Sequence, residues 1–467
     1  MWLGRTRHVH FVGIGGIGMS GIAELLVNVG YRVTGSDTRR SDITDRLATL
    51  GVGIRIGHDA SLVQQADVVV VSSAVRPDNP EIAAARAARI PVIPRAEMLA
   101  ELMRLRVGIA IAGAHGKTTT TSMVACVLEA GGLDPTAVIG GRLSAFGSNA
   151  RLGRGQYMVA EADESDRSFL KLSPAHAVVT NLDSEHLEAY GSFDALVDAF
   201  RDFAERVPFY GSVVACLDDD AVRERLLPQL TRRTITYGFH PDADVRGIDP
   251  EADGQSSRCE VRYELHGVPA GSGEARLELQ VPGRHNLQNA LAAIAVGLEI
   301  GVPIDRILAA LASFHGVERR YQRRGEVRGV TVVDDYGHHP TEIEAVLQAA
   351  RDGRPRRLVV VFQPHRYTRT RDCLEQFGPA LAAADVVVLT DIYPAGEAPI
   401  AGVTLAALAD AIRPHVGRLV TVERIEDAAP VVAGLAEPGD LVITLGAGSI
   451  AALPGQLLSA LAGKEAP

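Results

Sequence analysis

Short apolar runs alternate with amphipathic stretches of helical length along almost the whole chain. An apolar run of strand length followed by a crossover helix is the pattern of a parallel β-sheet with helices on its faces. The sequence therefore predicts an α/β fold. The candidate strands are His8 to Val12, Asp67 to Ser72, Val107 to Ala112, Tyr157 to Ala160, Ala177 to Asn181, Val330 to Asp334, Arg357 to Phe362, Ala384 to Thr390 and Asp440 to Thr444.

The length of 467 residues suggests about three domains of roughly 150 residues each. One boundary is expected near Leu105, before a new strand and glycine turn, and another near Gly316, before a charged segment. The predicted domains are residues 1–105, 106–316 and 317–467. The polar stretch from Pro241 to Gly273 is expected to form surface hairpins or loops with one weak strand, Cys259 to Leu265.

Charge and cysteine content exclude several classes of function. The formal net charge is -10 and the basic residues form no long run, which argues against binding of nucleic acid or of an anionic membrane surface. The four cysteines lie far apart, so neither a zinc knuckle nor a disulfide scaffold is indicated. Glu24 and several glycines interrupt the apolar stretch from Val9 to Val27, which therefore fits neither a signal peptide nor a membrane span. We expect a cytoplasmic protein.

A first glycine motif, Gly13 to Gly18, follows a predicted strand, and Asp37 ends the next strand. This order satisfies the fingerprint of dinucleotide-binding folds, so an NAD-dependent dehydrogenase is one reading. The glycines let backbone N–H groups approach a diphosphate at a helix N-terminus, and the diphosphate of a UDP-sugar would serve equally well. A tight turn with no ligand is the remaining alternative.

A second glycine motif contains one of only three lysines in the chain, Lys117. A strand, a glycine turn, Lys117-Thr118 and a helix form the arrangement that cradles phosphates: the backbone N–H groups and Lys117 contact phosphate oxygens, and the Thr118 hydroxyl contacts Mg²⁺. The strict Walker pattern is not met, because Ile111 stands where its first glycine belongs. The motif spans Gly113, Ala114, His115, Gly116, Lys117, Thr118 and Thr119.

Acidic residues gather after the next strands of the same region. Four acids lie between Glu161 and Asp166, and the segment Asn181 to His186 adds two acids and a histidine. A solvated loop would explain such clusters, but Mg²⁺ held with a nucleotide needs one or two carboxylates. His186 is placed to add a second metal ligand.

Two polar segments end adjacent strands of the last domain: Asp334 to Pro340 and Gln363 to Arg369. Open α/β sheets bind ligands at the carboxyl ends of their strands, and arginine grips a carboxylate with two parallel hydrogen bonds. A small anionic substrate is therefore indicated, with ordinary surface polarity as the alternative.

With these motifs in order, the chain resembles the Mur ligase family over essentially its whole length. The matching segments are GIGGIGMSGIAELL, GAHGKTTTT, EADESD, TNLDSEHLEAY, GRHNLQNALAAIAVG, GVERRYQ, DDYGHHPTEI, QPHRYTRT and YPAGEAPI. The resemblance implies a Rossmann-like UDP-sugar-binding domain, a central P-loop ATPase domain and a Rossmann-like C-terminal domain that binds an amino acid. GIGGIGM and DDYGHHP favour the branch of the family that adds L-alanine to UDP-N-acetylmuramate.

The resemblance also implies roles for individual residues. Lys117 and Thr118 would hold the ATP phosphates and Mg²⁺, Glu161 would ligate that Mg²⁺, and His186 would ligate a second one. Adenine would be recognised by His285 and Asn289. The UDP-sugar would contact Gly15, Gly16, Ile17, Gly18 and Ser73, and the L-alanine site would contain Tyr336, His338, Arg366 and Arg369.

The implied reaction activates the muramoyl carboxylate as an acyl phosphate, because a carboxylate oxygen is a poor leaving group in water. The amine of L-alanine must lose a proton, and His338 is our candidate for assisting. The family's carbamylated lysine is excluded from this region, because no lysine occurs between residues 172 and 463. The usual Asp-His pair is Glu185-His186 here, and Ala114 replaces a threonine.

Three other readings stay open on sequence alone. One is the family member that attaches a recycled tripeptide to UDP-N-acetylmuramate. A second is an NAD-dependent oxidoreductase, which leaves GAHGKTTTT and EADESD unexplained. A third is a nucleotide-binding regulatory module, which leaves the C-terminal tyrosine, histidine and arginine set unexplained. The sequence does not decide between a monomer and a homodimer.

Overall fold

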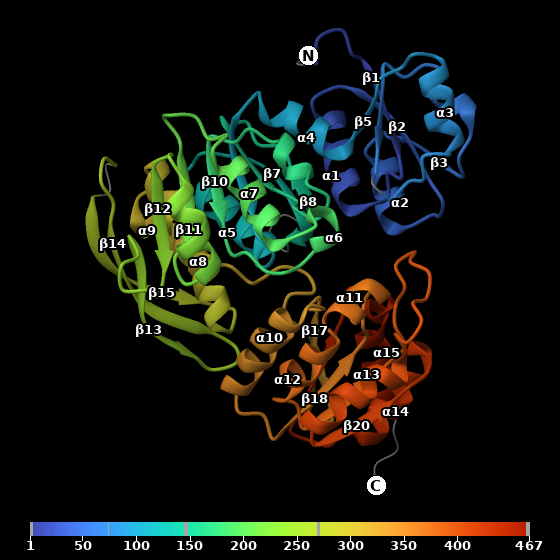
Figure 1. The fold of residues 1–467 in the computed structure, drawn as a ribbon, viewed down its shortest axis with the longest axis vertical. Helices are drawn as coiled ribbons and strands as arrows, with labels where there is room; N and C mark the ends of the chain where they lie inside the picture. The colour runs from blue at the N-terminus through green and yellow to red at the C-terminus, as the bar shows by residue number, and fades with distance from the viewer. Residues whose placement is uncertain (1–2, 73, 144–147, 269–270, 464–467) are drawn as a thin grey trace. The chain divides into compact units, whose positions relative to one another are not determined.

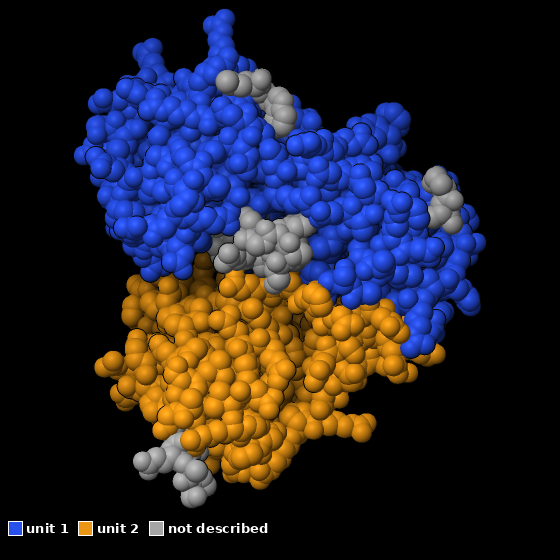
Figure 2. Space-filling view, turned by 180° about the vertical axis from the view of Figure 1, so that it is seen from behind, with its two compact units in different colours: residues 1–248, 260–277, 288–314 blue, residues 249–259, 278–287, 315–467 orange. Residues whose placement is uncertain are grey.

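A computed structural model describes residues 3–72, 74–143, 148–268 and 271–463. The chain forms two compact units, coloured separately in Figure 2. Unit 1 comprises residues 1–248, 260–277 and 288–314, and unit 2 comprises residues 249–259, 278–287 and 315–467. Strands and helices alternate throughout both units, which confirms the predicted α/β class.

The N-terminal part of unit 1 is a parallel five-stranded sheet in the order β3-β2-β1-β4-β5. The strand order reverses beside β1, so the glycine motif lies at the switch point where such sheets bind ligands. All five residues of β1 are buried, as expected for a strand covered on both faces. The elements are β1 (His8–Val12), α1 (Ile17–Asn28), β2 (Arg32–Asp37), α2 (Asp42–Thr49), β3 (Gly53–Ile56), β4 (Val68–Val71), α3 (Pro80–Ala87), β5 (Val92–Pro94) and α4 (Arg95–Met103).

A ten-stranded sheet follows, in the order β15-β14-β13-β12-β11-β10-β6-β9-β7-β8 (Figure 1). Strands β9, β6, β10, β11 and β12 run parallel, whereas β7 and β8 pair antiparallel. The strands are β6 (Val107–Ala112), β7 (Thr136–Leu143), β8 (Ser148–Arg151), β9 (Tyr157–Glu161), β10 (His176–Val179), β11 (Ser212–Cys216), β12 (Thr234–Gly238), β13 (Val245–Ala252), β14 (Ser257–Glu264) and β15 (Ser272–Leu279). The helices are α5 (Lys117–Ala130), α6 (Leu187–Tyr190), α7 (Phe193–Ala204), α8 (Arg284–Ile300) and α9 (Ile304–Ala312).

The stretch from Pro241 to Gly273 follows its prediction in part. The weak strand exists with slightly different ends, as β14, and β13 and β15 are its hydrogen-bonded neighbours, so the stretch forms hairpins rather than loops. These strands also belong to the main sheet, which was not predicted. Every second residue of β14 is exposed. A strand with one solvated face carries charged residues at those positions, which is why the stretch looks too polar for a sheet.

Unit 2 contains a six-stranded sheet in the order β16-β17-β21-β18-β19-β20. All neighbouring strands pair in parallel except the edge strand β16, which runs antiparallel to β17. The strands are β16 (Gln322–Val327), β17 (Val330–Asp335), β18 (Arg357–Phe362), β19 (Val386–Leu389), β20 (Arg418–Thr421) and β21 (Asp440–Leu445). The helices are α10 (Pro340–Asp352), α11 (Tyr367–Asp372), α12 (Phe377–Leu381), α13 (Leu405–Ile412), α14 (Ala428–Leu435) and α15 (Leu453–Gly463).

A buried polar network holds the N-terminal sheet together near the glycine motif. The Glu81 carboxylate is fully buried and lies 2.7 Å from both His10 Nε2 and His58 Nδ1. The Ser36 hydroxyl donates to the same carboxylate over 2.9 Å. Burial by itself would raise the pKa of Glu81, but the hydrogen bonds from His10, Ser36 and His58 outweigh it and hold the pKa below its ordinary value.

Replacing Glu81 with alanine is expected to lower the free energy of unfolding by about 3 to 5 kcal/mol, because it removes a hydrogen-bond partner from the buried His10 imidazole and from the partly buried His58 imidazole. In the unmodified protein the Glu81 contribution should be complete above the ordinary glutamate pKa and lost as the pH falls through the lowered one. Urea unfolding of Glu81→Ala beside Glu101→Ala, which removes a surface carboxylate, measures the difference. Equal losses in the two variants would contradict the assignment.

Candidate functional site

The first glycine turn joins β1 to α1 and is tightened by residues at the end of β2. The Ser36 carbonyl accepts hydrogen bonds from the backbone N–H groups of Gly13 and Ile14, at 2.9 and 3.0 Å. The Gly15 N–H donates to the Asp37 carboxylate over 2.9 Å, and a Cβ on Gly15 would lie equally close to that oxygen. Gly13 has a φ of +80°, which favours glycine.

The remaining residues predicted for this turn are placed as follows. Gly16 precedes α1 and Ile17 begins it, while a Cβ on Gly18 would lie 3.1 Å from the Arg95 guanidinium. Ser73 lies outside the described residues. Arg95 is a neighbour that the sequence prediction missed, since nothing in its local pattern distinguishes it from other arginines.

The second glycine turn joins β6 to α5 and can be built only with glycine at two positions. Gly113 and Gly116 have φ values of +136° and +79°. A Cβ on Gly113 would approach Thr180 Oγ1 to 2.0 Å, and one on Gly116 would approach Asn289 Oδ1 to 2.6 Å. Thr118 and Thr119 lie in the first turn of the 14-residue helix α5, so the N-terminus of that helix faces the turn. A helix N-terminus behind a glycine turn attracts anions.

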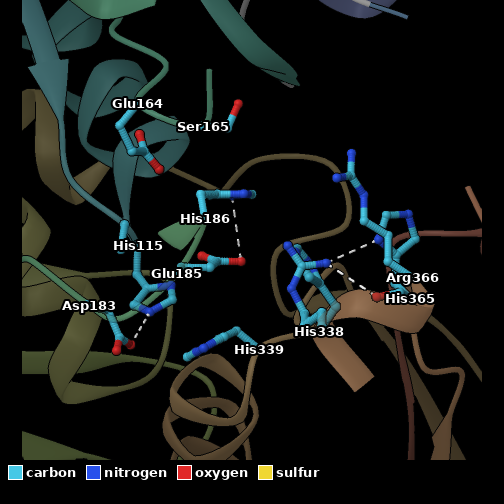
Figure 3. A network of polar contacts seen from close by, with 12 residues as sticks. His115, Glu164, Ser165, Asp183, Glu185, His186, His338, His339, His365 and Arg366 are labelled. Carbon is cyan, nitrogen blue, oxygen red and sulfur yellow. Dashed lines mark hydrogen bonds and ion pairs between the residues drawn. The ribbon is translucent and has the colours of Figure 1, made fainter. Parts of the chain in front are cut away.

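Residues after β10 fix the turn from the other side. The Asn181 side-chain oxygen accepts from the His115 N–H over 2.8 Å, and the Asn181 carbonyl accepts from the Ala114 N–H over 3.3 Å. His115 Nε2 lies 2.8 Å from an Asp183 oxygen (Figure 3). The two segments that the sequence places at separate strand ends are therefore joined at one edge of the sheet, as predicted for parallel strands.

Lys117 is the cation of this site. Its ammonium donates to the Gly113 and Ala114 carbonyls over 2.6 and 3.0 Å and to Glu164 Oε1 over 2.8 Å. Burial alone would lower the pKa of Lys117, but the Glu164 carboxylate raises it above its ordinary value. Lys117 is therefore fully charged at neutral pH.

Among the predicted acids, Glu161 and Glu164 have different surroundings. Glu161 ends β9, and its carboxylate accepts from the Gly140 N–H over 2.6 Å. Glu164 is only 3% exposed, and burial raises its pKa to about 7 although Lys117 opposes the shift. Between them, Asp163 pairs with Arg95 at 3.1 Å. The acidic cluster is thus an organised part of the site rather than a solvated loop.

His186 occupies an unusual backbone conformation. Its φ of +58° is rare outside glycine, and strain of this kind gathers at functional sites. Its imidazole lies 3.8 Å from Glu185 and 3.7 Å from Glu188, as the dashed contact in Figure 3 marks for Glu185. Imidazole beside carboxylates suits a divalent metal ion.

The pair predicted to recognise adenine lies on one helix, α8, four residues apart. Burial lowers the pKa of His285 to about 4, so its imidazole is neutral and one ring nitrogen can accept a hydrogen bond. Asn289 is buried, and its side-chain oxygen accepts from the Thr120 hydroxyl over 3.2 Å. Asn289 therefore also supports the glycine turn from behind.

Unit 2 brings the predicted C-terminal set together at the carboxyl ends of β17 and β18. The prediction that these two strands are adjacent is wrong, because β21 pairs between them. The rings of Tyr336 and His338 meet edge to face at 5.4 Å, and the His338 ring lies 5.5 Å from that of His365. Arg369 donates to the His365 carbonyl over 3.3 Å and lies 3.2 Å from its ring nitrogen. His338, His365 and Arg366 are labelled in Figure 3.

Arg366 differs from its neighbour in what it contacts. It precedes α11 with a φ of +71°, and its backbone N–H donates to the Tyr393 carbonyl over 2.8 Å. Among the described residues, its guanidinium approaches Glu397 to 4.0 Å, and its buried Nε has no hydrogen-bond partner. Tyr393 stacks on His365 at 5.5 Å. Tyr393 and Glu397 lie in the quoted segment YPAGEAPI, but the sequence prediction gave neither residue a role in the site.

The residues of unit 1 fit an ATP–magnesium complex. The N-terminus of α5 faces the turn beside the Lys117 ammonium, and both would attract phosphate oxygens. Thr118, Glu161 and His186 would offer oxygen and nitrogen ligands to divalent cations. The buried Oε2 of Glu164 has no hydrogen-bond partner among the described residues, so an unsatisfied acceptor lies beside the lysine.

Comparison with known proteins gives a consistent result. Three family models match in order: the Mur ligase family catalytic domain at residues 8–106, the Mur ligase middle domain at 111–297 and the Mur ligase glutamate ligase domain at 319–448. The UDP-N-acetylmuramate–L-alanine ligase of Geobacter sulfurreducens is 55% identical over 450 residues, which is 96% of each chain.

Solved structures agree. The UDP-N-acetylmuramate–alanine ligase of Thermotoga maritima superposes with a TM-score of 0.81 at 31% identity, covering 97% of this chain and 98% of that one. A murein peptide ligase from Psychrobacter arcticus gives 0.73 at 25% identity, covering 98% and 100%. This chain belongs to the Mur ligase family.

Proposed function

We propose that the chain ligates L-alanine to the carboxylate of UDP-N-acetylmuramate at the expense of ATP. The products are UDP-N-acetylmuramoyl-L-alanine, ADP and phosphate, and the reaction belongs to peptidoglycan biosynthesis. The observation that carries the proposal is the 55% identity, over 96% of both chains, to a relative named for this reaction. The glycine turn with Lys117 supports the use of ATP.

Each of three regions of the chain binds one substrate. Residues 1–105 bind the UDP-sugar, residues 106–316 bind ATP, and residues 317–467 bind the amino acid. In the first region the contacts come from Gly15, Gly16, Ile17, Gly18 and Ser73. The glycine turn lies at the switch point of the sheet and leads into the N-terminus of helix α1, and both features support a diphosphate at this position.

In the second region, Lys117 and the backbone of residues 113–119 hold the ATP phosphates. Thr118 and Glu161 ligate Mg²⁺, and His186 ligates a second ion, while His285 and Asn289 contact adenine. Transfer of the terminal phosphoryl group to the muramoyl carboxylate creates an acyl phosphate, whose leaving group is phosphate. The bound metal ions would neutralise charge on the transferring group, and the Lys117 ammonium would add to this effect.

In the third region, Arg366 and Arg369 receive the carboxylate of L-alanine beside Tyr336, and His338 assists removal of the amine proton. His338 Nδ1 lies 3.0 Å from the Tyr336 carbonyl. A carbonyl can only accept, so this contact places the ring proton on Nδ1 and leaves Nε2 as the basic nitrogen. The buried, unpartnered Nε of Arg366 supports an anion at this position.

The proposed partners are small molecules only, and the proposed location is the cytoplasm, where nucleotide-linked precursors and ATP occur. None of the described helices combines the length and apolarity that a membrane crossing requires. The four cysteines are free thiols, which fits a reducing compartment.

Phosphate release tests the proposal directly. The full chain with ATP, Mg²⁺ and UDP-N-acetylmuramate should release phosphate only when an amino acid is added, with L-alanine giving the highest kcat/KM. A pocket that distinguishes one methyl group gains about 1 to 3 kcal/mol, so some turnover with glycine is expected. Turnover with a tripeptide but not with L-alanine would instead assign the chain to the tripeptide-adding ligases, and no turnover with any of them would overturn the proposal.

A further inference from the structure

The N–H donors of the Lys117 ammonium are all engaged in hydrogen bonds within the protein, so none is available to a phosphate. An ammonium group has three N–H donors. In this structure all three are used, by the carbonyls of Gly113 and Ala114 and by Glu164 Oε1. A phosphate oxygen can therefore reach Lys117 only when one of these three acceptors gives up its place.

The acceptor that can leave is Glu164. The two carbonyls belong to the glycine turn, whose backbone is fixed. Thr180 and Asn289 pack against its glycines, and the Asn181 side chain accepts a hydrogen bond from its backbone. Glu164 contributes a side chain with its own rotatable bonds. Its backbone is held separately, because the Tyr190 hydroxyl donates to the Glu164 carbonyl over 2.5 Å. The carboxylate can thus swing away while the backbone of its segment stays in place.

The carboxylate is also incompletely satisfied where it lies. Glu164 Oε2 is buried and has no hydrogen-bond partner, although a carboxylate accepts about four hydrogen bonds in water. Leaving a buried carboxylate oxygen without a partner is unfavourable, because the hydrogen bonds that it made to water are not replaced. The ion pair between Lys117 and Glu164 therefore orders the lysine, but it leaves Glu164 Oε2 without a hydrogen bond. Moving the carboxylate out to water would remove this free-energy cost.

We propose that Glu164 is a positioning residue that takes the place of a phosphate oxygen on Lys117 and is displaced when nucleotide binds. The inference rests on the proposed use of ATP. In the nucleotide-free protein Glu164 keeps Lys117 extended into the turn and neutralises its buried charge. A nucleotide phosphate must compete with this internal anion, so the carboxylate weakens nucleotide binding while it preserves the geometry of the lysine.

Calorimetric titration of the full chain with ADP in the presence of Mg²⁺ tests the proposal through Glu164→Gln. Glutamine keeps the shape and one acceptor oxygen but removes the competing charge, so ADP should bind about tenfold more tightly than to the unmodified protein. Glu164→Asp keeps the charge on a shorter side chain and should bind ADP with intermediate affinity. A gain of affinity cannot arise from structural damage, which would weaken binding.

The matched control is Glu129→Gln, which removes the same charge near the far end of helix α5 from a half-exposed residue paired with Arg151. Its ADP affinity should equal that of the unmodified protein. Unchanged or weaker ADP binding by Glu164→Gln, in a protein whose thermal unfolding is still cooperative, overturns the displacement proposal while leaving the ATP assignment intact. Failure of the unmodified chain to bind ADP at all overturns both.

Discussion

Replacing Lys117 with alanine is expected to reduce the rate of ligation by at least about 1,000-fold. The lysine is the only lysine in the glycine turn, its side chain is only 18% exposed, and Glu164 keeps it charged. A buried cation aimed at a transferring phosphoryl group contributes more than one in water, because water does not screen it. Affinity for UDP-N-acetylmuramate should change little, since that substrate is proposed to bind at the other glycine turn. Phosphate release and calorimetry with the UDP-sugar measure the two properties.

Lys171→Ala is the matched control for Lys117→Ala. Lys171 lies in the same unit, is 44% exposed and pairs only with the surface residue Glu97, at 3.2 Å, among the contacts of the described chain. Its removal should leave turnover nearly unchanged. Because Lys117→Ala leaves Glu164 buried without its cation, the double variant Lys117→Ala/Glu164→Gln should unfold at a higher temperature than the single variant and remain inactive. Near-normal turnover in either lysine-117 variant would remove the phosphate assignment.

The alternation of apolar runs and helices was sufficient to predict the parallel cores of the sheets. Strands β1, β6 and β18 begin and end at the predicted residues, because buried parallel strands are continuous apolar runs bounded by glycine or polar residues. Strands β13 and β15, which lie between residues 245 and 279, could not be predicted in the same way. Their exposed faces are charged.

The candidate site was predictable as a set of segments but not as a set of contacts. Local sequence patterns indicate the chemistry of three groups: the glycine turns, the acids after β9 and the histidines after β17. The partner of Lys117 has no such pattern: Glu164 is one of four neighbouring acids, and only the fold shows which one reaches the lysine. The contacts between Tyr393 and His365 and between Arg95 and Asp163 could not be predicted either, because the two residues of each pair are distant in sequence.

Replacing Arg366 or Arg369 with alanine is expected to raise the L-alanine concentration needed for half-maximal turnover by about 10- to 100-fold. Each change removes a charge-assisted hydrogen bond worth about 1.5 to 3 kcal/mol. The residues fall within one helical turn, since α11 begins at Tyr367, directly after Arg366. Lysine should restore only part of the loss, because it keeps the charge and loses the planar fork of donors.

The two arginines should not be equivalent in these titrations. Arg369 already donates to the His365 carbonyl. Within the part of the chain that the structure describes, the Arg366 guanidinium approaches only Glu397, at 4.0 Å, and its buried Nε has no partner. Arg366 therefore has more to gain from a substrate carboxylate, and its loss should have the larger effect on L-alanine. Arg371→Ala removes an exposed arginine of the same helix and should leave the requirement unchanged. If either Arg366→Ala or Arg369→Ala raises the requirement for ATP as much as that for L-alanine, the arginine concerned serves the phosphoryl group, and the proposed amino-acid site is wrong.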